Sequence, residues 1–184
     1  ESTKLWLPGG LEFKFEDLLY SLLVSSAGDA GCTLAFSKFE RDIFIAMMNQ
    51  KAEDLGMNDT QFTNEIGLDG YNGSHYSTAW DLYLLSQEAA KDSLIRNIVK
   101  TKEYTIQDIS GEFEVNTVNT NKLLWEIPNT IGIKTGTTSG AGEVLLYRYR
   151  EGLKDITIVV LSSDERFLDT RNLLDWIISS YQWN

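Results

Sequence analysis

Helical spacing of apolar residues dominates the first third of the chain. In residues 16–24 the apolar positions recur three and four apart, so the four leucines of this stretch share one helical face. They are Leu18, Leu19, Leu22 and Leu23. Further helices are predicted over residues 29–36 and 41–55. One side of the longer helix is lined by Ile43, Ala46, Met47 and Leu55, and Gly56 follows where a left-handed cap would end it.

The middle of the chain passes from loop to helix to strands. Residues 58–74 are polar and contain glycines, which predicts a long ordered loop. Ser77 is the expected N-cap of a helix that carries Leu82, Leu85 and Ala89. Residues 101–107 and 112–118 read as strands with Ser110 and Gly111 between them, and this pattern predicts a β-hairpin.

Three strands in succession are predicted in the last third, at residues 131–138, 143–150 and 156–162. Their short glycine-bearing links favour an antiparallel meander. An amphipathic helix over residues 165–181 follows, and the side expected to cover the sheet carries Leu173, Leu174, Trp176 and Ile177. Helices, a meander and a closing helix predict an α+β fold, an antiparallel sheet flanked by helices, in a single domain that spans residues 1–184.

Composition narrows the classes of partner. The 184 residues carry 16 basic and 27 acidic side chains, a formal net charge of −11. An acidic chain without a basic cluster repels nucleic acid, so we expect no nucleic-acid partner. Cys32 is the one cysteine and His75 the one histidine, so no zinc-type cluster is predicted. Cys32 lies in an apolar stretch and is expected to be a buried structural thiol.

Neither a membrane-spanning run nor a signal peptide is visible. No stretch is long and apolar enough to cross a bilayer. The chain begins with Glu1, and no basic region precedes an apolar segment. Because the chain could be a mature product or a fragment, this absence does not indicate the cytoplasm.

Lys134, Thr135 and Gly136 open the predicted meander and carry the first chemical signal. On a strand, the lysine supplies a positive charge, the threonine a hydroxyl donor, and the glycine lets a ligand lie close to the backbone. Such a strand suits an extended substrate that ends in a carboxylate. The structural alternative is a solvent-facing lysine beside a turn.

Lys-Thr-Gly belongs, with Ser-x-x-Lys and a Ser-Asp-Asn type element, to the motif set of penicillin-binding proteins and class A β-lactamases. The chain resembles the low-molecular-weight penicillin-binding proteins, which are serine-type D-alanyl-D-alanine carboxypeptidases, from about Leu7 to Trp176. In chain order, the resemblance is carried by Glu16-Asp17-Leu18-Leu19, Ser25-Ser26-Ala27-Gly28-Asp29-Ala30, Met48-Asn49-Gln50-Lys51-Ala52, Leu55-Gly56-Met57, His75-Tyr76-Ser77-Thr78, Asn119-Thr120-Asn121-Lys122, Lys134-Thr135-Gly136, Arg166-Phe167 and Leu173-Leu174-Asp175-Trp176.

The resemblance departs from the family at two places. Gly28 stands where the family's Ser-x-Asn element has its asparagine, so the carboxamide that helps to hold the substrate is missing. The Ser-x-x-Lys motif lies several tens of residues before Glu16 in the family, so this chain is expected to be N-terminally incomplete. Glu1-Ser2-Thr3-Lys4 has glutamate where that serine would be.

The resemblance implies a β-lactamase/transpeptidase-like fold and an acyl-serine peptidase that removes the terminal D-alanine of peptidoglycan stem peptides. The catalytic candidates are Ser26 and Lys134, and the substrate-binding candidates are Thr135, Gly136 and Thr137, the last through its N–H in the oxyanion hole. His75 is expected to be structural.

The resemblance also implies the partners and the place of action. The partners are the stem peptide that ends in D-Ala-D-Ala and, if the nucleophile is supplied, β-lactams. No metal or cofactor is implied, and the location is extracytoplasmic. The alternatives are a catalytically inactive relative or fragment that only binds peptide, and a β-lactamase-like hydrolase, although the glutamate-bearing loop of class A β-lactamases is not recognisable.

Overall fold

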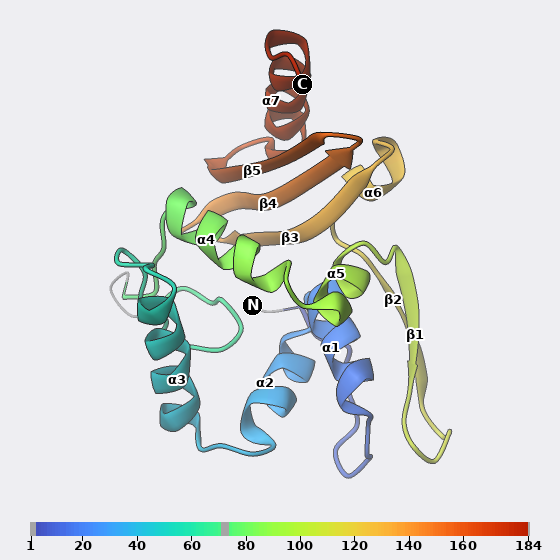
Figure 1. Cartoon of the computed structure of the whole chain (residues 1–184). Coiled ribbons are helices and arrows are strands. Elements are labelled where there is room, and N and C mark those ends of the chain that lie inside the picture. Colours follow the sequence, from blue (N-terminus) through green and yellow to red (C-terminus); the bar gives the residue numbers. More distant parts are fainter. Residues whose placement is uncertain (1–2, 71–73, 184) are drawn as a thin grey trace.

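The computed structural model describes residues 3–70 and 74–183, and the fold is α+β as predicted, with antiparallel strands flanked by helices (Figure 1). Three helices lie in the first third: α1 (Phe15–Val24), α2 (Gly28–Phe36) and α3 (Arg41–Asp54). Gly56 has a φ of 75° after α3, which confirms the left-handed cap. Ile43 and Met47 remain exposed on α3, whose one buried residue is Ala52. No helix in the described ranges is long and apolar enough to cross a membrane.

The loop predicted over residues 58–74 is irregular where it is described, and its residues 71–73 lie outside the described part. The following helices are α4 (Ala79–Ala89) and α5 (Ser93–Val99). The prediction of Ser77 as the cap of α4 is wrong by one position, since the side chain of Thr78 accepts the hydrogen bond from the Asp81 N–H. Helix α5, capped by the Asp92 carboxylate, was missed. It is only seven residues long, too short to show a clear apolar period.

The hairpin and the meander are both confirmed. Strands β1 (Glu103–Gln107) and β2 (Glu114–Val118) pair antiparallel. After the four-residue helix α6 (Leu123–Glu126), the chain forms β3 (Thr130–Thr138), β4 (Gly142–Glu151) and β5 (Lys154–Ser163). Their order in the sheet is β3-β4-β5, so β3 is an edge strand.

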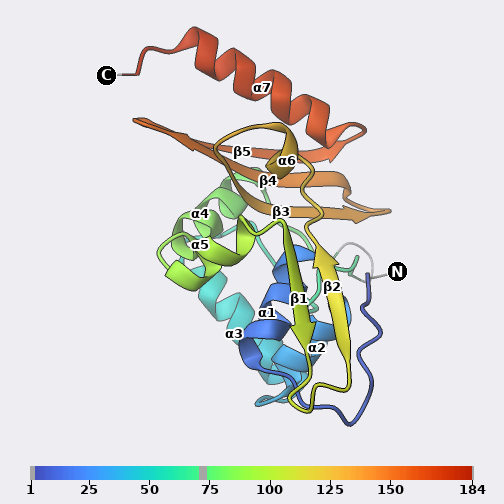
Figure 2. The ribbon, with the colours of Figure 1, turned by 90° about the vertical axis from the view of Figure 1, so that its right-hand side faces the viewer.

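Helix α7 (Arg166–Ser180) packs on one face of this sheet, and α4 and α5 lie on the other side (Figures 1 and 2). The main core forms under α7 from Leu123, Leu145, Tyr147, Tyr149, Ile156, Ile158, Val160 and Leu174. Leu174 is buried and Ile177 packs against this cluster, as predicted. Leu173 and Trp176 are 40% and 55% exposed, so the predicted covering face of α7 is narrower than its apolar positions suggest.

Two long-range contacts hold α1, one in its first turn and one at its end, just before the turn where Ser26 lies. The hydroxyl of Tyr104 on β1 donates to the buried Asp17 carboxylate of α1 at 2.6 Å. The Thr120 N–H donates to the Val24 carbonyl at 3.1 Å and so fastens the end of α1 to the segment after β2. Both ends of α1 are therefore held by residues of β1 and of the segment between β2 and β3.

Candidate active site

Ser26 lies between α1 and α2 in a left-handed conformation, with a φ of 62°. For a residue with a side chain this conformation costs on the order of 1–3 kcal/mol, so the neighbouring structure must hold it in place. The Ser25 hydroxyl and the Ala27 N–H both donate to the Ser21 carbonyl, at 2.9 and 3.2 Å. This tight turn presents the Ser26 hydroxyl toward the sheet.

Lys134 on β3 reaches that hydroxyl. Its Nζ donates hydrogen bonds to Ser26 Oγ and, at 3.0 Å, to the Thr135 carbonyl oxygen. Burial lowers the pKa of the Lys134 ammonium to about 8, and the nearby Arg166 charge acts in the same direction. The structure thus brings together the two predicted catalytic residues, which are 108 positions apart.

The other predicted residues of the motif differ in their surroundings. Thr135 is buried, and its hydroxyl pairs with the hydroxyl of Thr120 at 2.6 Å. A Cβ on Gly136 would come within 2.7 Å of a Val144 methyl group, so packing against β4 favours glycine here. Thr137 is exposed at the same end of β3.

Arg166, at the start of α7, contacts the same end of β3 as this motif. The sequence alone assigned no role to Arg166. Its Nη1 donates to the Gly136 carbonyl at 2.7 Å and to Thr137 Oγ1 at 2.6 Å. Its side chain is 14% exposed, and Nε lies 3.8 Å from a carboxylate oxygen of Glu143. The only sequence feature that could have pointed to Arg166 is the Arg166-Phe167 pair, which is part of the ordered resemblance. The pair has no evident chemical role until the fold places Arg166 beside Gly136.

The arrangement of these side chains is suited to bind the negatively charged end of a ligand. Lys134 and Arg166 supply two positive charges, and the hydroxyls of Ser26, Thr135 and Thr137 supply hydrogen-bond donors. Because β3 is an edge strand, an extended peptide can pair with its free side. Within residues 3–70 and 74–183, no group of three acidic, imidazole or thiol side chains could hold a metal ion.

Gly28, where the resemblance calls for an asparagine, contributes only its backbone. Its N–H donates to the Thr3 carbonyl at 2.7 Å at the start of α2. The cluster around Ser26 and Lys134 therefore has no side-chain amide from this position.

Asp69 fastens the long loop to the end of β3. Its carboxylate accepts hydrogen bonds from the Thr138 hydroxyl at 2.5 Å and from the Gly140 N–H at 2.9 Å. These bonds, with that of Thr138 first, hold the pKa of the Asp69 carboxyl below its usual range. The link between β3 and β4 is thereby fixed beside the candidate site.

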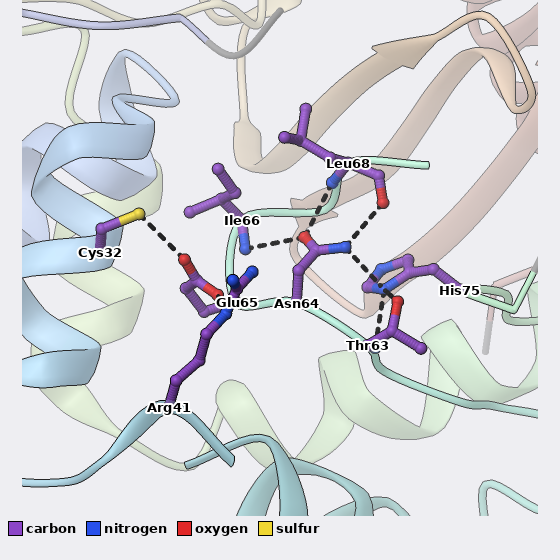
Figure 3. Close-up of polar contacts among 8 residues, drawn as sticks. All are labelled: Cys32, Arg41, Thr63, Asn64, Glu65, Ile66, Leu68 and His75. Carbon is purple, nitrogen blue, oxygen red and sulfur yellow. Dashed lines mark hydrogen bonds and ion pairs between the residues drawn. The ribbon is translucent and has the colours of Figure 1, made fainter. Parts of the chain in front are cut away.

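His75 has a structural role in the same loop (Figure 3). Its Nδ1 accepts a hydrogen bond from the Thr63 N–H at 3.1 Å and lies 3.2 Å from the Asn64 side-chain nitrogen. Burial lowers the pKa of His75, and the charge of Asp69 opposes this shift. A ring nitrogen that accepts from the loop backbone agrees with the expectation that His75 is structural.

Cys32 on α2 packs against the other end of that loop (Figure 3). Its thiol, which is partly buried, donates to Glu65 Oε1 at 2.9 Å, and Arg41 Nε lies 3.7 Å from Glu65 Oε2. Burial first, and then the Glu65 contact, raises the pKa of the thiol to about 11. The thiol is therefore partly buried and not buried as predicted, because its side chain points to the Glu65 carboxylate of the loop.

The family model for D-alanyl-D-alanine carboxypeptidases matches residues 1–165. The chain is 30% identical over 185 residues to D-alanyl-D-alanine carboxypeptidase DacF of Bacillus subtilis, covering 98% of this chain and 46% of that protein. It is 33% identical to DacC of Escherichia coli, covering 95% of this chain and 43% of that protein. The chain therefore spans about half the length of the curated relatives it matches.

Solved structures share the fold. A putative penicillin-binding protein homologue from Mycobacterium tuberculosis superposes with a TM-score of 0.90 at 28% identity, over 100% of this chain and 72% of that chain. A point mutant of the Streptomyces K15 DD-transpeptidase superposes with a TM-score of 0.89 at 30% identity, over 97% of this chain and 73% of that chain.

Proposed function

The chain belongs to the D-alanyl-D-alanine carboxypeptidase family, and on that premise we propose that it is part of a serine-type peptidase that removes the terminal D-alanine of peptidoglycan stem peptides. The observation that carries the proposal is the hydrogen bond from Lys134 Nζ to Ser26 Oγ, which joins the two motifs of the resemblance. On this proposal residues 1–184 all belong to one penicillin-binding domain, which acts outside the cytoplasmic membrane, where its substrate lies.

Each residue of the cluster has a proposed role. Lys134 and Arg166 bind the terminal carboxylate of the peptide, with help from the Thr135 hydroxyl. Gly136 lets the peptide backbone approach β3, and the Thr137 N–H completes the oxyanion hole. Ser26 passes a proton toward the leaving D-alanine, because its hydroxyl both accepts from Lys134 and can donate onward.

The acylated serine is the part that this chain does not supply. In the family it belongs to a Ser-x-x-Lys motif, and residues 1–184 contain no such quartet. We therefore propose that this chain alone neither releases D-alanine nor forms a covalent adduct with a β-lactam. Both activities require a segment with that motif.

The test uses two preparations. The chain alone, and the chain co-expressed with a segment of a D-alanyl-D-alanine carboxypeptidase that carries the Ser-x-x-Lys motif, are each given an acyl-D-Ala-D-Ala peptide and fluorescent penicillin. We expect D-alanine release and a labelled band on a denaturing gel only from the second preparation, with the label on the added segment. Lys134→Ala should reduce D-alanine release at least about a hundredfold, and Lys38→Ala on the exposed surface should leave it unchanged.

Two results would contradict the proposal. A labelled band from the chain alone would place a nucleophile within residues 1–184, and the variant Ser26→Ala would then test Ser26. A co-expressed pair that binds the peptide tightly without releasing D-alanine would indicate a peptide-binding relative, and Gly28→Asn would show whether the missing carboxamide is the cause.

A further inference from the structure

A cavity of about 440 Å³ lies beside the first half of β3, between that strand, the end of β4, the end of α4 and helix α5. It is distinct from the cluster around Ser26, since none of the five predicted site residues lines it. A cavity of this size falls in the range that accommodates small ligands. The proposed peptidase function gives it no role.

The charge of the cavity is opposite to that of the chain. Among the described residues that line it, four are cationic and none is acidic: Arg96, Lys100, Arg148 and Arg150. These are four of only 16 basic residues in a chain with a net charge of −11. The carboxylate that pairs with two of them is Asp155, which lies 2.7 Å from Arg148 and 3.9 Å from Arg150. One negative charge against four leaves the cavity strongly positive.

Two of the four cationic groups are fixed in place. Arg148 donates two hydrogen bonds to Asp155, both of 2.7 Å. Arg96 donates through Nη1 to the carbonyl oxygens of Ala90 and Lys91, at 2.7 and 2.8 Å. A guanidinium has five N–H donors, and the two bonds of Arg96 use only the two donors on Nη1. A ligand that meets such a held group loses less conformational freedom than one that must order a flexible side chain.

Much of the remaining wall of the cavity is apolar. Ile95 and Val99 of α5 line it together with Ile131 and Ile133 of β3, and two alanines at the end of α4 extend this apolar part. Ser86 and Asn97 are the two uncharged polar residues among the described lining residues. A hydrated inorganic ion gains nothing from such a wall, whereas an anion with a hydrocarbon part buries both ends favourably.

A second hollow offers a comparison within the same molecule. Between α6, the end of β4 and α7, a cavity of about 470 Å³ also has an apolar lining, which includes Ile127 and Leu174. Its charged residues are mainly acidic: Glu126, Glu151 and Asp175, with Arg171 as the one cation among them. Of these two cavities of similar size, the one beside α5 is positive and the other is not.

We propose that the cavity between α5 and β3 is a binding site for an amphiphilic oxyanion, a carboxylate or phosphate head joined to a short hydrocarbon group. The head lies among Arg96, Lys100 and Arg150, and the hydrocarbon group lies on Ile95 of α5 and the two lining isoleucines of β3. The shared chemistry is that of a carboxylic acid or of a phosphate monoester, and the ligands of the test separate the two.

Calorimetric titration of the whole chain tests the proposal with five probes: hexyl phosphate, hexanoate, inorganic phosphate, hexan-1-ol and hexylammonium. We expect one saturable site for hexyl phosphate, hexanoate or both, with a dissociation constant that rises with salt. Inorganic phosphate and hexan-1-ol should each bind at least about tenfold more weakly, because each lacks one half of the interaction. Hexylammonium should not compete.

Variants and methyl NMR locate the site. The double variant Lys100→Gln/Arg150→Gln should raise the dissociation constant at least about tenfold. The control Lys14→Gln/Lys38→Gln removes the same charge from exposed positions before α1 and after α2, and should change it less than about twofold. In the unaltered chain the methyl signals of Ile95, Ile131 and Ile133 should shift with ligand, and that of the exposed Ile43 should not.

Three outcomes would overturn the inference. They are no saturable binding of either amphiphilic anion, equally tight binding of hexan-1-ol, and equal weakening by the two double variants. Methyl shifts confined to the acidic hollow beside α7 would also exclude the assigned position.

Discussion

The guanidinium of Arg166 lies 2.7 Å from the carbonyl oxygen of Gly136. This hydrogen bond fastens the first residue of α7 to the edge strand, and it places a second positive charge beside the Lys134 ammonium. The charge at this end of the site is therefore set by a residue that follows Gly136 by 30 positions.

Removing the charge of Arg166 is expected to raise the pKa of Lys134. Arg166→Gln keeps a hydrogen-bond donor near Gly136 but removes the repulsion that, after burial, helps to lower that pKa to about 8. The Lys134 Cε signal in a ¹³C NMR titration gives the midpoint directly. Arg171→Gln is the control, because Arg171 also lies on α7 but pairs with Glu126. An unchanged midpoint in Arg166→Gln would show that burial alone lowers the pKa.

The stability of the protein should depend on pH through Lys134. Its pKa falls from 10.5 to about 8 on folding, so the unfolded chain binds more protons between these values. The penalty of burying the ammonium is thus fully present below pH 8 and disappears as the pH rises to 10.5. A difference of this size corresponds to on the order of 3 kcal/mol.

Lys134→Met measures that penalty by urea unfolding at several pH values. The variant loses the hydrogen bonds of Lys134 at every pH, so the change of its relative stability with pH, and not its value at one pH, reports the charge. We expect the free energy of unfolding of the variant relative to the original chain to fall as the pH rises from 8 to 10.5. A constant difference across this range would contradict the lowered pKa.

Tyr104→Phe should destabilise the fold by on the order of 1–3 kcal/mol, because it removes the hydroxyl that donates to the buried Asp17 carboxylate. The contact joins β1 to the first turn of α1, the helix that leads to Ser26. The midpoint of urea unfolding measures the loss. Tyr181→Phe, at an exposed position, should have a much smaller effect. Equal effects of the two variants would mean that the contact with Asp17 adds no stability.

Cys32 should react slowly with iodoacetamide. With a pKa of about 11, the thiol carries far less thiolate at pH 8 than an ordinary cysteine, and the thiolate is the reactive form. We expect a rate at least about tenfold slower than in the urea-unfolded chain. Glu65→Gln should speed the reaction by removing the carboxylate beside the thiol. Mass spectrometry follows the alkylation, and equal rates in the folded and unfolded chains would refute the raised pKa.

Periodic patterns in the sequence predict the meander, the hairpin and the long helices. Each of these elements buries one face, and the spacing of its apolar residues follows from its local backbone geometry. The turn at Gly56 is predictable for a similar reason, since only the local φ matters there. The patterns fail where tertiary packing decides. Leu173 and Trp176 are apolar and remain 40% and 55% exposed, whereas α7 packs Leu174 and Ile177 against the core.

In the candidate site, too, the sequence identifies some residues and misses others that only the fold brings close. The Lys-Thr-Gly motif identifies Lys134, and the ordered resemblance identifies Ser26, but no local pattern marks Arg166 or Thr120 as their neighbours. Thr120 pairs with Thr135 across 15 positions, and Arg166 reaches Gly136 only after two strands have returned. Such contacts depend on the register of the sheet, which a single sequence specifies weakly at its ends.

The long separation between Ser26 and Lys134 has a consequence for folding kinetics. The two helices that flank Ser26 and the meander that carries Lys134 are built mainly from neighbours in the chain, whereas their meeting closes a loop of 108 positions. Closure of a long loop is entropically costly, and contacts of this kind slow folding. The helices and strands should therefore form before the hydroxyl and the ammonium meet. During refolding, the circular dichroism signal of the helices and strands should return before ligand binding does. Helix content is therefore a poor measure of the fraction of a preparation that can bind ligand.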